Sequence, residues 1–253
     1  MLNSNAAKRA VWIIGAALFV VASTAFAHTT IRSQVTESTT DDNAIKIGHG
    51  CETPDGSAHL PVVATSVVFP GDAPELTASD GSMIGDLSQV IEQGTIAGLA
   101  RAVQDRSIFR TQQVKFDSLE NQVGFSGTQG SLNPDLPGRM PFQFTGPKFQ
   151  ATSCAKRLLV KVAIADVCLL GFGMADSVQL GKVNLWIPDN GSQFSVLGGQ
   201  LGVDGVGAPA TLTVNRNLTT NPLAPACGAG IDVTVTPSAA DVNANLPIPG
   251  VWP

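Results

Sequence analysis

The chain has three histidines, and the first of them carries the most chemical information. His28 directly follows Ala25-Phe26-Ala27, which has the small-x-small pattern of a leader-peptidase cleavage site. Cleavage after Ala27 would give His28 a free α-amine. That amine and the ring Nδ1 can close a six-membered chelate on one metal ion, and an amine with an imidazole suits Cu(II). An internal histidine cannot form this chelate, so the position of the cut decides whether the site exists.

The residues before His28 have the order of a secretory leader. Residues 1–10 contain two basic side chains, residues 11–21 are apolar apart from one glycine, and small residues follow. The apolar stretch is about half of the roughly 20 residues that span a bilayer, which argues against a membrane anchor. We therefore expect residues 1–27 to be a signal peptide, and the processed protein to be periplasmic or extracellular with no membrane span. A cut after Ala25 is the alternative, and it would leave a phenylalanine first.

The other two histidines have less distinctive surroundings. His49 lies in a glycine-flanked turn beside Cys51, where a disulfide could fix its position. Antiparallel pairing of the flanking strands could bring it near His28, because paired strands are only about 5 Å apart. His49 would then either give the metal a further nitrogen or hydrogen-bond the backbone of its turn, and the sequence leaves both open. His59 lies in a polar loop and is expected to be solvated. Oxygen ligands are available from five acidic residues, between which the sequence does not choose: Glu37, Asp41, Asp42, Glu52 and Asp55.

Length and charge limit the classes of protein to consider. Removing 27 of the 253 residues leaves 226, enough for one large β domain or two small ones. We expect a single domain over residues 28–253. Without Lys8 and Arg9, 13 basic residues remain against 20 acidic ones, so the net charge is about −7. No basic run remains, and binding to nucleic acid or to anionic lipid is not expected.

The cysteine count indicates cross-links. Four cysteines follow the leader, and an even number in an oxidising compartment favours two disulfides, for which three pairings exist. None of the spacings is C-x-x-C, which argues against a zinc cluster, a thioredoxin-like pair or attached haem. The cysteines are Cys51, Cys154, Cys168 and Cys227.

Composition and patterning predict a β protein. Only 14% of the residues are charged, and 26 glycines and 16 prolines accompany many β-forming residues, which is typical of a turn-rich β fold. Short apolar or alternating runs between turn residues predict strands whose spacing favours a sandwich or a Greek-key barrel. These runs cover residues 29–36, 45–47, 62–69, 158–170, 178–187, 210–215 and 231–236.

Residues 84–108 interrupt the strand pattern. Apolar residues recur there at helical intervals, from Leu87 to Val103, with polar residues on the other face. This periodicity predicts one or two helices despite Gly94 and Gly98. We expect a short helical insertion between strands that serves packing rather than acting as a lid.

Several short blocks of the sequence resemble the YcnI-like copper-binding family. Its members are exported β-sandwich proteins whose mature N-terminal histidine binds Cu(II), often with a carboxylate and a nearby tryptophan. A later stretch around Trp186 looks like the tryptophan-containing strand of that family, and Cys154 looks like its second cysteine. The early blocks are Ala27-His28-Thr29-Thr30-Ile31, Ile47-Gly48-His49-Gly50-Cys51 and Val67-Val68-Phe69-Pro70-Gly71.

The resemblance implies a fold and a site. The fold would be all-β, an Ig-like or cupredoxin-like β-sandwich, here with the short helical insertion. The metal would be Cu(II), held by His28, and His49 is the candidate further ligand that its own position in the sequence offers. Trp186 would lie over the copper. The disulfides that the resemblance implies are Cys51–Cys154 and Cys168–Cys227.

These features predict an exported Cu(II)-binding protein for copper acquisition, storage or delivery. Its partners would be the copper ion and a copper-transport or copper-chaperone protein. The sequence has no G-x-S-x-G and no H-E-x-x-H motif, so we do not expect an enzyme. A disulfide-stabilised structural or surface-assembly β module without metal is the alternative. A copper monooxygenase that uses His28 with His49 is a second alternative.

Overall fold

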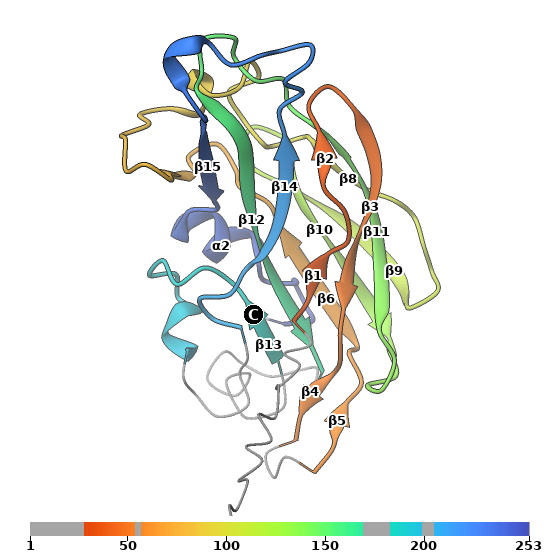
Figure 1. The fold of residues 1–253 in the computed structure, drawn as a ribbon. Coiled ribbons are helices and arrows are strands. Elements are labelled where there is room, and N and C mark those ends of the chain that lie inside the picture. The colour runs from red at the N-terminus through yellow and green to blue at the C-terminus, as the bar shows by residue number, and fades with distance from the viewer. Residues whose placement is uncertain (1–27, 54–56, 169–182, 199–204, 253) are drawn as a thin grey trace, which may run out of the picture.

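The computed structural model describes residues 28–53, 57–168, 183–198 and 205–252. The predicted signal peptide and the first residues of the predicted strand 178–187 lie outside the described residues. Within them the regular secondary structure is mostly β-strand, which confirms the predicted all-β class (Figure 1).

The strands are β1 (Thr30–Ile31), β2 (Val35–Thr36), β3 (Thr40–Ile47), β4 (Cys51–Glu52), β5 (His59–Leu60), β6 (Ala64–Val68), β7 (Glu75–Ala78), β8 (Ala100–Ala102), β9 (Phe109–Phe116), β10 (Gln122–Gly130), β11 (Gly138–Thr145), β12 (Ala155–Val167), β13 (Val183–Trp186), β14 (Ala210–Asn215) and β15 (Ile231–Thr236). The helical elements are η1 (Leu87–Gln89), η2 (Ser195–Leu197), η3 (Pro225–Cys227) and α2 (Ala239–Asn245).

The described strands form two layers and a small hairpin. One layer is a four-stranded sheet in the order β1-β3-β11-β8. The other is a nine-stranded sheet with the path β2-β14-β12-β6-β10-β9, joined by β13, β15 and β7. The hairpin β4–β5 lies at the lower end of the molecule in Figure 1, near β13.

The long strand β12 organises the larger sheet because its two halves have different neighbours. Its first half pairs with β14 on one side and with β15 on the other. Its second half pairs with β6 and with β13. One strand of 13 residues therefore connects the two ends of the molecule.

Aromatic side chains fill the space between the two layers. Phe125 lies in β10 of the nine-stranded sheet, and Phe69 directly follows β6 of the same sheet. Both rings contact Phe142 of the four-stranded sheet, and Phe69 also contacts Phe144. Each of these rings is at most 1% exposed, so the layers share one core. This arrangement is an all-β sandwich, as predicted.

The predicted strand over residues 29–36 is two strands in different sheets. β1 pairs with β3 in the smaller sheet, whereas β2 pairs with β14 in the larger one. The Asn43 side chain hydrogen-bonds both the N–H and the carbonyl of Ser33 at the crossing. The alternating pattern marked the strand residues correctly but did not reveal that the chain changes sheets between them.

The predicted helices over residues 84–108 are wrong. The structure forms only the short turn η1 and, later, the strand β8. Gly94 and Gly98 have φ values of 68° and 82°, which interrupt any α-helix. The apolar periodicity nevertheless marked core residues, since Leu87 and Ile96 are both buried. The apolar spacing therefore identified buried residues, but those residues lie on irregular turns and not on a helix.

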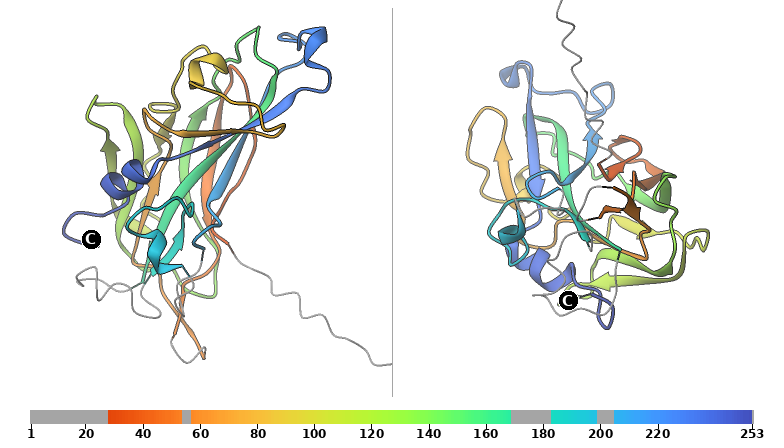
Figure 2. Two further views of the ribbon diagram at one scale, coloured as in Figure 1. Left: turned by 90° about the vertical axis from the view of Figure 1, so that its left-hand side faces the viewer. Right: turned by 90° about the horizontal axis from the view of Figure 1, so that it is seen from below.

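A helix that the sequence analysis missed covers the outer face of the larger sheet. α2 lies outside the layered strands beside the C-terminus (Figure 2). Ser238 and Asp241 form a capping box at its first turn, a serine–x–x–acid signal that the sequence contains. Val242 of the helix belongs to a second apolar cluster with residues of β6, β12 and β13. β6 is consequently buried along its whole length.

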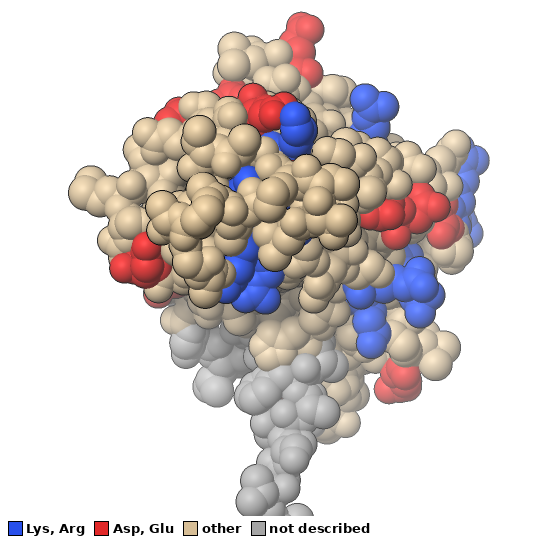
Figure 3. Space-filling view, turned by 45° about the horizontal axis from the view of Figure 1, so that its top comes forward, with Lys and Arg blue, Asp and Glu red and all other residues tan. Residues whose placement is uncertain are grey.

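Charged side chains are distributed over the surface in separate groups. The face shown in Figure 3 is mostly uncharged, with basic and acidic side chains in several small clusters. Within the described chain, no helix is long and apolar enough to cross a membrane.

Candidate functional site

His28 is held at the end of the sandwich through the residue that follows it. Thr29 is 2% exposed, and its hydroxyl donates a hydrogen bond of 2.6 Å to Oδ2 of Asp166. The chain then enters β1, which pairs with β3 (Thr30 opposite Lys46). The position of His28 is therefore set by a buried polar contact and by a sheet pairing one residue later.

Trp186 provides the surface against which His28 lies. The two ring centroids are 4.9 Å apart, with the planes tilted by 45°. Trp186 ends β13 and is buried, and its indole N–H donates a 3.0 Å hydrogen bond to Asp166 Oδ2. Gly205 packs on the same indole, because a Cβ added there would lie 2.4 Å from the indole Cε3. The structure thus brings Trp186 to His28, although 158 residues separate them in sequence.

Asp166 connects these groups and is the site residue that the sequence analysis missed. It is fully buried in β12 and also accepts a 2.7 Å hydrogen bond from the hydroxyl of Thr65 on β6. Burial raises the pKa of this carboxyl, against the opposing effect of its hydrogen bonds and of the nearby His49. A lone acidic residue in an apolar strand is a signal that could have identified it, since buried acids need partners.

His49 also lies beside this tryptophan. Its ring centroid is 6.5 Å from that of Trp186 in an edge-on arrangement, and its Nδ1 hydrogen-bonds the carbonyl of Gly50. A carbonyl only accepts, so Nδ1 carries the hydrogen, and in the neutral ring Nε2 then carries the lone pair. Asn184 on β13 donates to the same carbonyl at 3.3 Å. The two alternatives for His49 are therefore compatible, because the ring bonds the backbone through one nitrogen and leaves the other for a ligand.

Gly50 allows the hairpin to approach this closely. A Cβ at this position would lie 1.7 Å from the carbonyl oxygen of Leu60, so only glycine fits. His59, at the start of β5, is exposed as expected, but it is not simply solvated. Its ring centroid is 5.1 Å from that of His49, with a tilt of 55°. All three histidines therefore contact either Trp186 or one another.

The disulfide pairing implied by the resemblance is wrong. The structure pairs Cys51 with Cys168 and Cys154 with Cys227, with Cα–Cα distances of 6.0 and 5.1 Å. The physical reason is the length of β12, because Cys154 directly precedes this strand and Cys168 directly follows it. At about 3.3 Å per residue these two cysteines lie up to about 46 Å apart, at opposite ends of the sandwich. Cys51 is at the histidine end and can reach only Cys168.

The acidic residues named as candidate oxygen ligands have other roles where they are described. Glu37 is buried and accepts hydrogen bonds from backbone and side-chain N–H groups. Asp41 and Asp42 lie in β3, and each accepts a hydrogen bond from a neighbouring side chain. Glu52 is exposed opposite His59 in the hairpin, and Asp55 lies outside the described residues.

The described side chains do not gather three metal-ligating groups at one point. Among them, no group of three His, Cys, Asp or Glu is placed to hold one metal ion. The His28 chelate needs only one side chain, since its second nitrogen is a backbone amine that cleavage would create. The surroundings of His28 are therefore the place where the predicted Cu(II) site can be tested.

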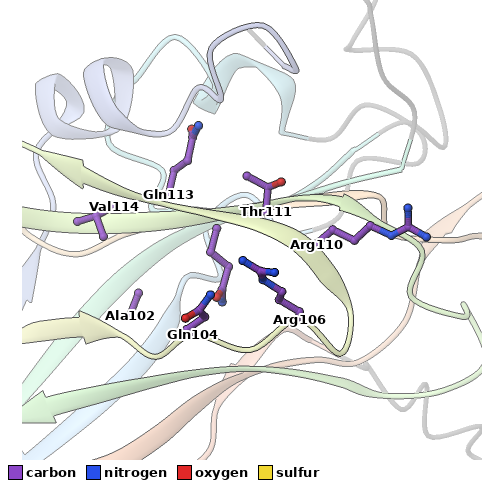
Figure 4. Close-up of a pocket in the computed structure, with 8 residues that line it drawn as sticks. Ala102, Gln104, Arg106, Arg110, Thr111, Gln113 and Val114 are labelled. Carbon is purple, nitrogen blue, oxygen red and sulfur yellow. The ribbon is translucent and has the colours of Figure 1, made fainter.

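A second concave feature lies between the edge strands β8 and β9. This cleft has a volume of about 320 Å³ and contains two arginines with glutamine and threonine side chains. Figure 4 shows Arg106 turned toward Gln104, whereas Arg110 extends away from both. The lining has no histidine, cysteine or carboxylate, so it offers neither a soft metal ligand nor a general base. Its chemistry differs from that of the histidine end.

Comparison with known proteins adds no assignment. No family model and no curated protein matches this chain.

Proposed function

We propose that this is an exported Cu(II)-binding protein of the YcnI-like kind, which acquires, stores or delivers copper without catalytic turnover. After cleavage before His28, the α-amine and Nδ1 of that residue hold the ion. Both donors are uncharged nitrogens, a set that suits Cu(II). The ion is the cargo of the protein, exchanged with a copper-transport or copper-chaperone partner.

One observation carries the proposal: a single buried carboxyl fixes the surroundings of His28 from two sides. Asp166 accepts hydrogen bonds from Thr29, next to His28, and from Trp186, on which the His28 ring lies. A mobile terminus would lose entropy on binding a metal, and this anchoring reduces that loss. The indole also covers one side of the imidazole with an apolar surface.

The decisive experiment compares two forms of the chain that differ only at the terminal amine. Both begin with His28, and the second carries an acetyl group on its α-amine, which converts the amine into an amide. We expect Cu(II) to bind the first form at least about a hundredfold more tightly, because only there can the chelate close. Binding should weaken below about pH 6, since protons compete for both nitrogens. Equal affinities for the two forms would refute the chelate.

The mass of the protein recovered after export tests the premise separately. A chain that starts at His28 supports the proposal, and any other first residue removes the amine from the site.

The two disulfides favour one other candidate, a cross-linked structural β module that uses no metal. Such a module would keep its stability and fold without copper and would show no difference between the two forms. A copper titration of the processed protein separates the candidates.

A further inference from the structure

His49 and His59 form a pair of imidazoles on the hairpin end of the molecule. Their ring centroids are 5.1 Å apart and their planes are tilted by 55°. His49 precedes β4 and His59 begins β5, and the pairing of the two strands places Glu52 opposite His59. The two histidines therefore come from the two arms of one hairpin, and their rings meet at an offset along it rather than as a directly opposed pair.

The separation matches the geometry of two imidazoles on one metal ion. A metal–nitrogen bond of about 2.0–2.1 Å places each ring centroid about 3.2 Å from the metal. At a near-tetrahedral angle, two such centroids lie about 5.2 Å apart. A linear arrangement would need more than about 6 Å, which the pair does not provide.

The tautomer of His49 leaves a nitrogen for the metal. Its Nδ1–H is donated to the Gly50 carbonyl, so Nε2 carries the lone pair. A backbone carbonyl that accepts from the other ring nitrogen is the usual support for a metal-binding histidine. The same carbonyl also accepts from Asn184, which fixes its direction.

The hairpin that carries the pair is anchored. The Cys51–Cys168 disulfide joins the start of β4 to the end of β12, and Gly50 packs directly on the Leu60 carbonyl. His49 is thereby held in place, while the exposed His59 can adjust. One fixed and one adjustable ligand can close on an ion at little cost in entropy.

We propose that His49 and His59 form a second metal site, which binds one divalent transition-metal ion, Cu(II) or Zn(II), through two imidazole nitrogens. Solvent completes the coordination. This site goes beyond the His28 chelate and does not need the free amine. The proposed site also pairs His49 with His59, a combination that the sequence did not suggest.

The test uses the full mature chain with the α-amine of His28 acetylated, so that the amine chelate is blocked. Titration with Zn²⁺ should show one ion bound per chain. His59→Gln and His49→Gln should each weaken this binding by at least about tenfold, because one imidazole is lost. Glu75→Gln, at an exposed position of β7, is the control, and it should leave the affinity unchanged.

Three results would overturn the site: no Zn²⁺ bound by the acetylated chain, unchanged affinity in His59→Gln, or one ion shared by two chains in a metal-dependent dimer. His59 is exposed, so its variant keeps the test valid even where His49→Gln alters the turn. The outcome is also separate from that of the chelate. Equal Cu(II) affinity of the free and acetylated chains refutes the chelate alone, whereas the Zn²⁺ titration refutes the histidine pair alone.

Discussion

Asp166 is a carboxyl group buried where three segments of the chain meet. It accepts hydrogen bonds from Thr29 and from Thr65, which lie 137 and 101 residues away in the sequence, and from Trp186 on the neighbouring strand. A buried acid is costly unless donors surround it, and here three donors do so. The polar contacts therefore specify which segments come together at this end of the core.

Replacing Asp166 by alanine tests this role. The change leaves two hydroxyls and one indole N–H without their acceptor, and we expect the free energy of unfolding to fall by about 2–4 kcal/mol. Urea denaturation followed by tryptophan fluorescence measures the loss. Asp135→Ala, at an exposed position, is the control and should change stability by less than about 0.5 kcal/mol. Equal effects of the two substitutions would contradict the role given to Asp166.

At this scale the sequence identified residues with distinctive chemistry but not their partners. His28 stood out because of the cleavage pattern before it, and Trp186 because of the resemblance. Asp166 and the His49–His59 contact depend on which strands pair, and that register results from packing across the whole sandwich. His59 was expected to be solvated because its polar loop predicts exposure. Its contact with His49 could not be predicted, because it depends on how the hairpin folds.

Among the elements, α2 depends on a lysine from a distant strand. The Nζ of Lys115 in β9 donates hydrogen bonds to the carbonyls of Asn245, Leu246 and Pro247, where the helix ends. These are carbonyls that a helix leaves without partners at its C-terminus. The Lys115 Nζ also donates a hydrogen bond of 2.6 Å to the hydroxyl of Ser66. Burial lowers the pKa of Lys115 to about 7.

This lysine should make stability depend on pH. Above about pH 7 the folded protein releases the Lys115 proton, while the unfolded chain keeps it up to the ordinary lysine pKa of 10.5. Between these two values the unfolded state binds more protons, so stability rises with pH across this window, and below about pH 7 this group adds no further pH dependence. We expect a gain of about 1–3 kcal/mol from pH 7 to 10, less than the full shift because the three carbonyls favour the ammonium.

Urea denaturation of wild type and Lys115→Met across this pH range measures the effect. The variant lacks the titrating group and should lose the rise, and it should also be less stable because the helix carbonyls lose their donor. Lys46→Met, at an exposed position of β3, should retain the rise. A parallel pH dependence in all three proteins would contradict the prediction.

The elements themselves were predictable where local pattern and burial coincide. The predicted strands 210–215 and 231–236 match β14 and β15 to the residue. Residues 84–108 failed because apolar spacing reports burial, and positive-φ glycines allow a turn to bury the same side chains that a helix would. Sequence patterning predicted no strand between residues 109 and 145, where β9, β10 and β11 form, and the capping box of α2 was not recognised.

Across the whole molecule, the two disulfides restrain opposite ends of the sandwich. Cys51–Cys168 closes a span of 117 residues at the histidine end, and Cys154–Cys227 closes one of 73 residues at the other. The sequence gives the number of bridges but not their pairing, because pairing follows from which end of β12 each cysteine occupies. Each bridge restrains the unfolded chain and stabilises the fold by about 2–5 kcal/mol.

The two bridges should differ in their effect on metal binding. Replacing Cys51 and Cys168 together by serine releases the hairpin, so we expect Zn²⁺ affinity at the histidine pair to fall at least about tenfold. Replacing Cys154 and Cys227 removes a bridge of similar strength at the far end and should leave that affinity unchanged. Calorimetric titration of the two folded double variants makes the comparison, and equal losses would show that the bridge does not position the pair.

The burial of Thr29 sets an order of events for the newly made chain. Proteases act on polypeptide that is extended and accessible around the cut, and a folded strand is not. The bond before His28 lies one residue from a buried hydroxyl and two from the first sheet pairing. Under the proposed function, trimming must therefore come before folding, because a chain that folded first would protect the proposed cleavage point and would not form the proposed chelate.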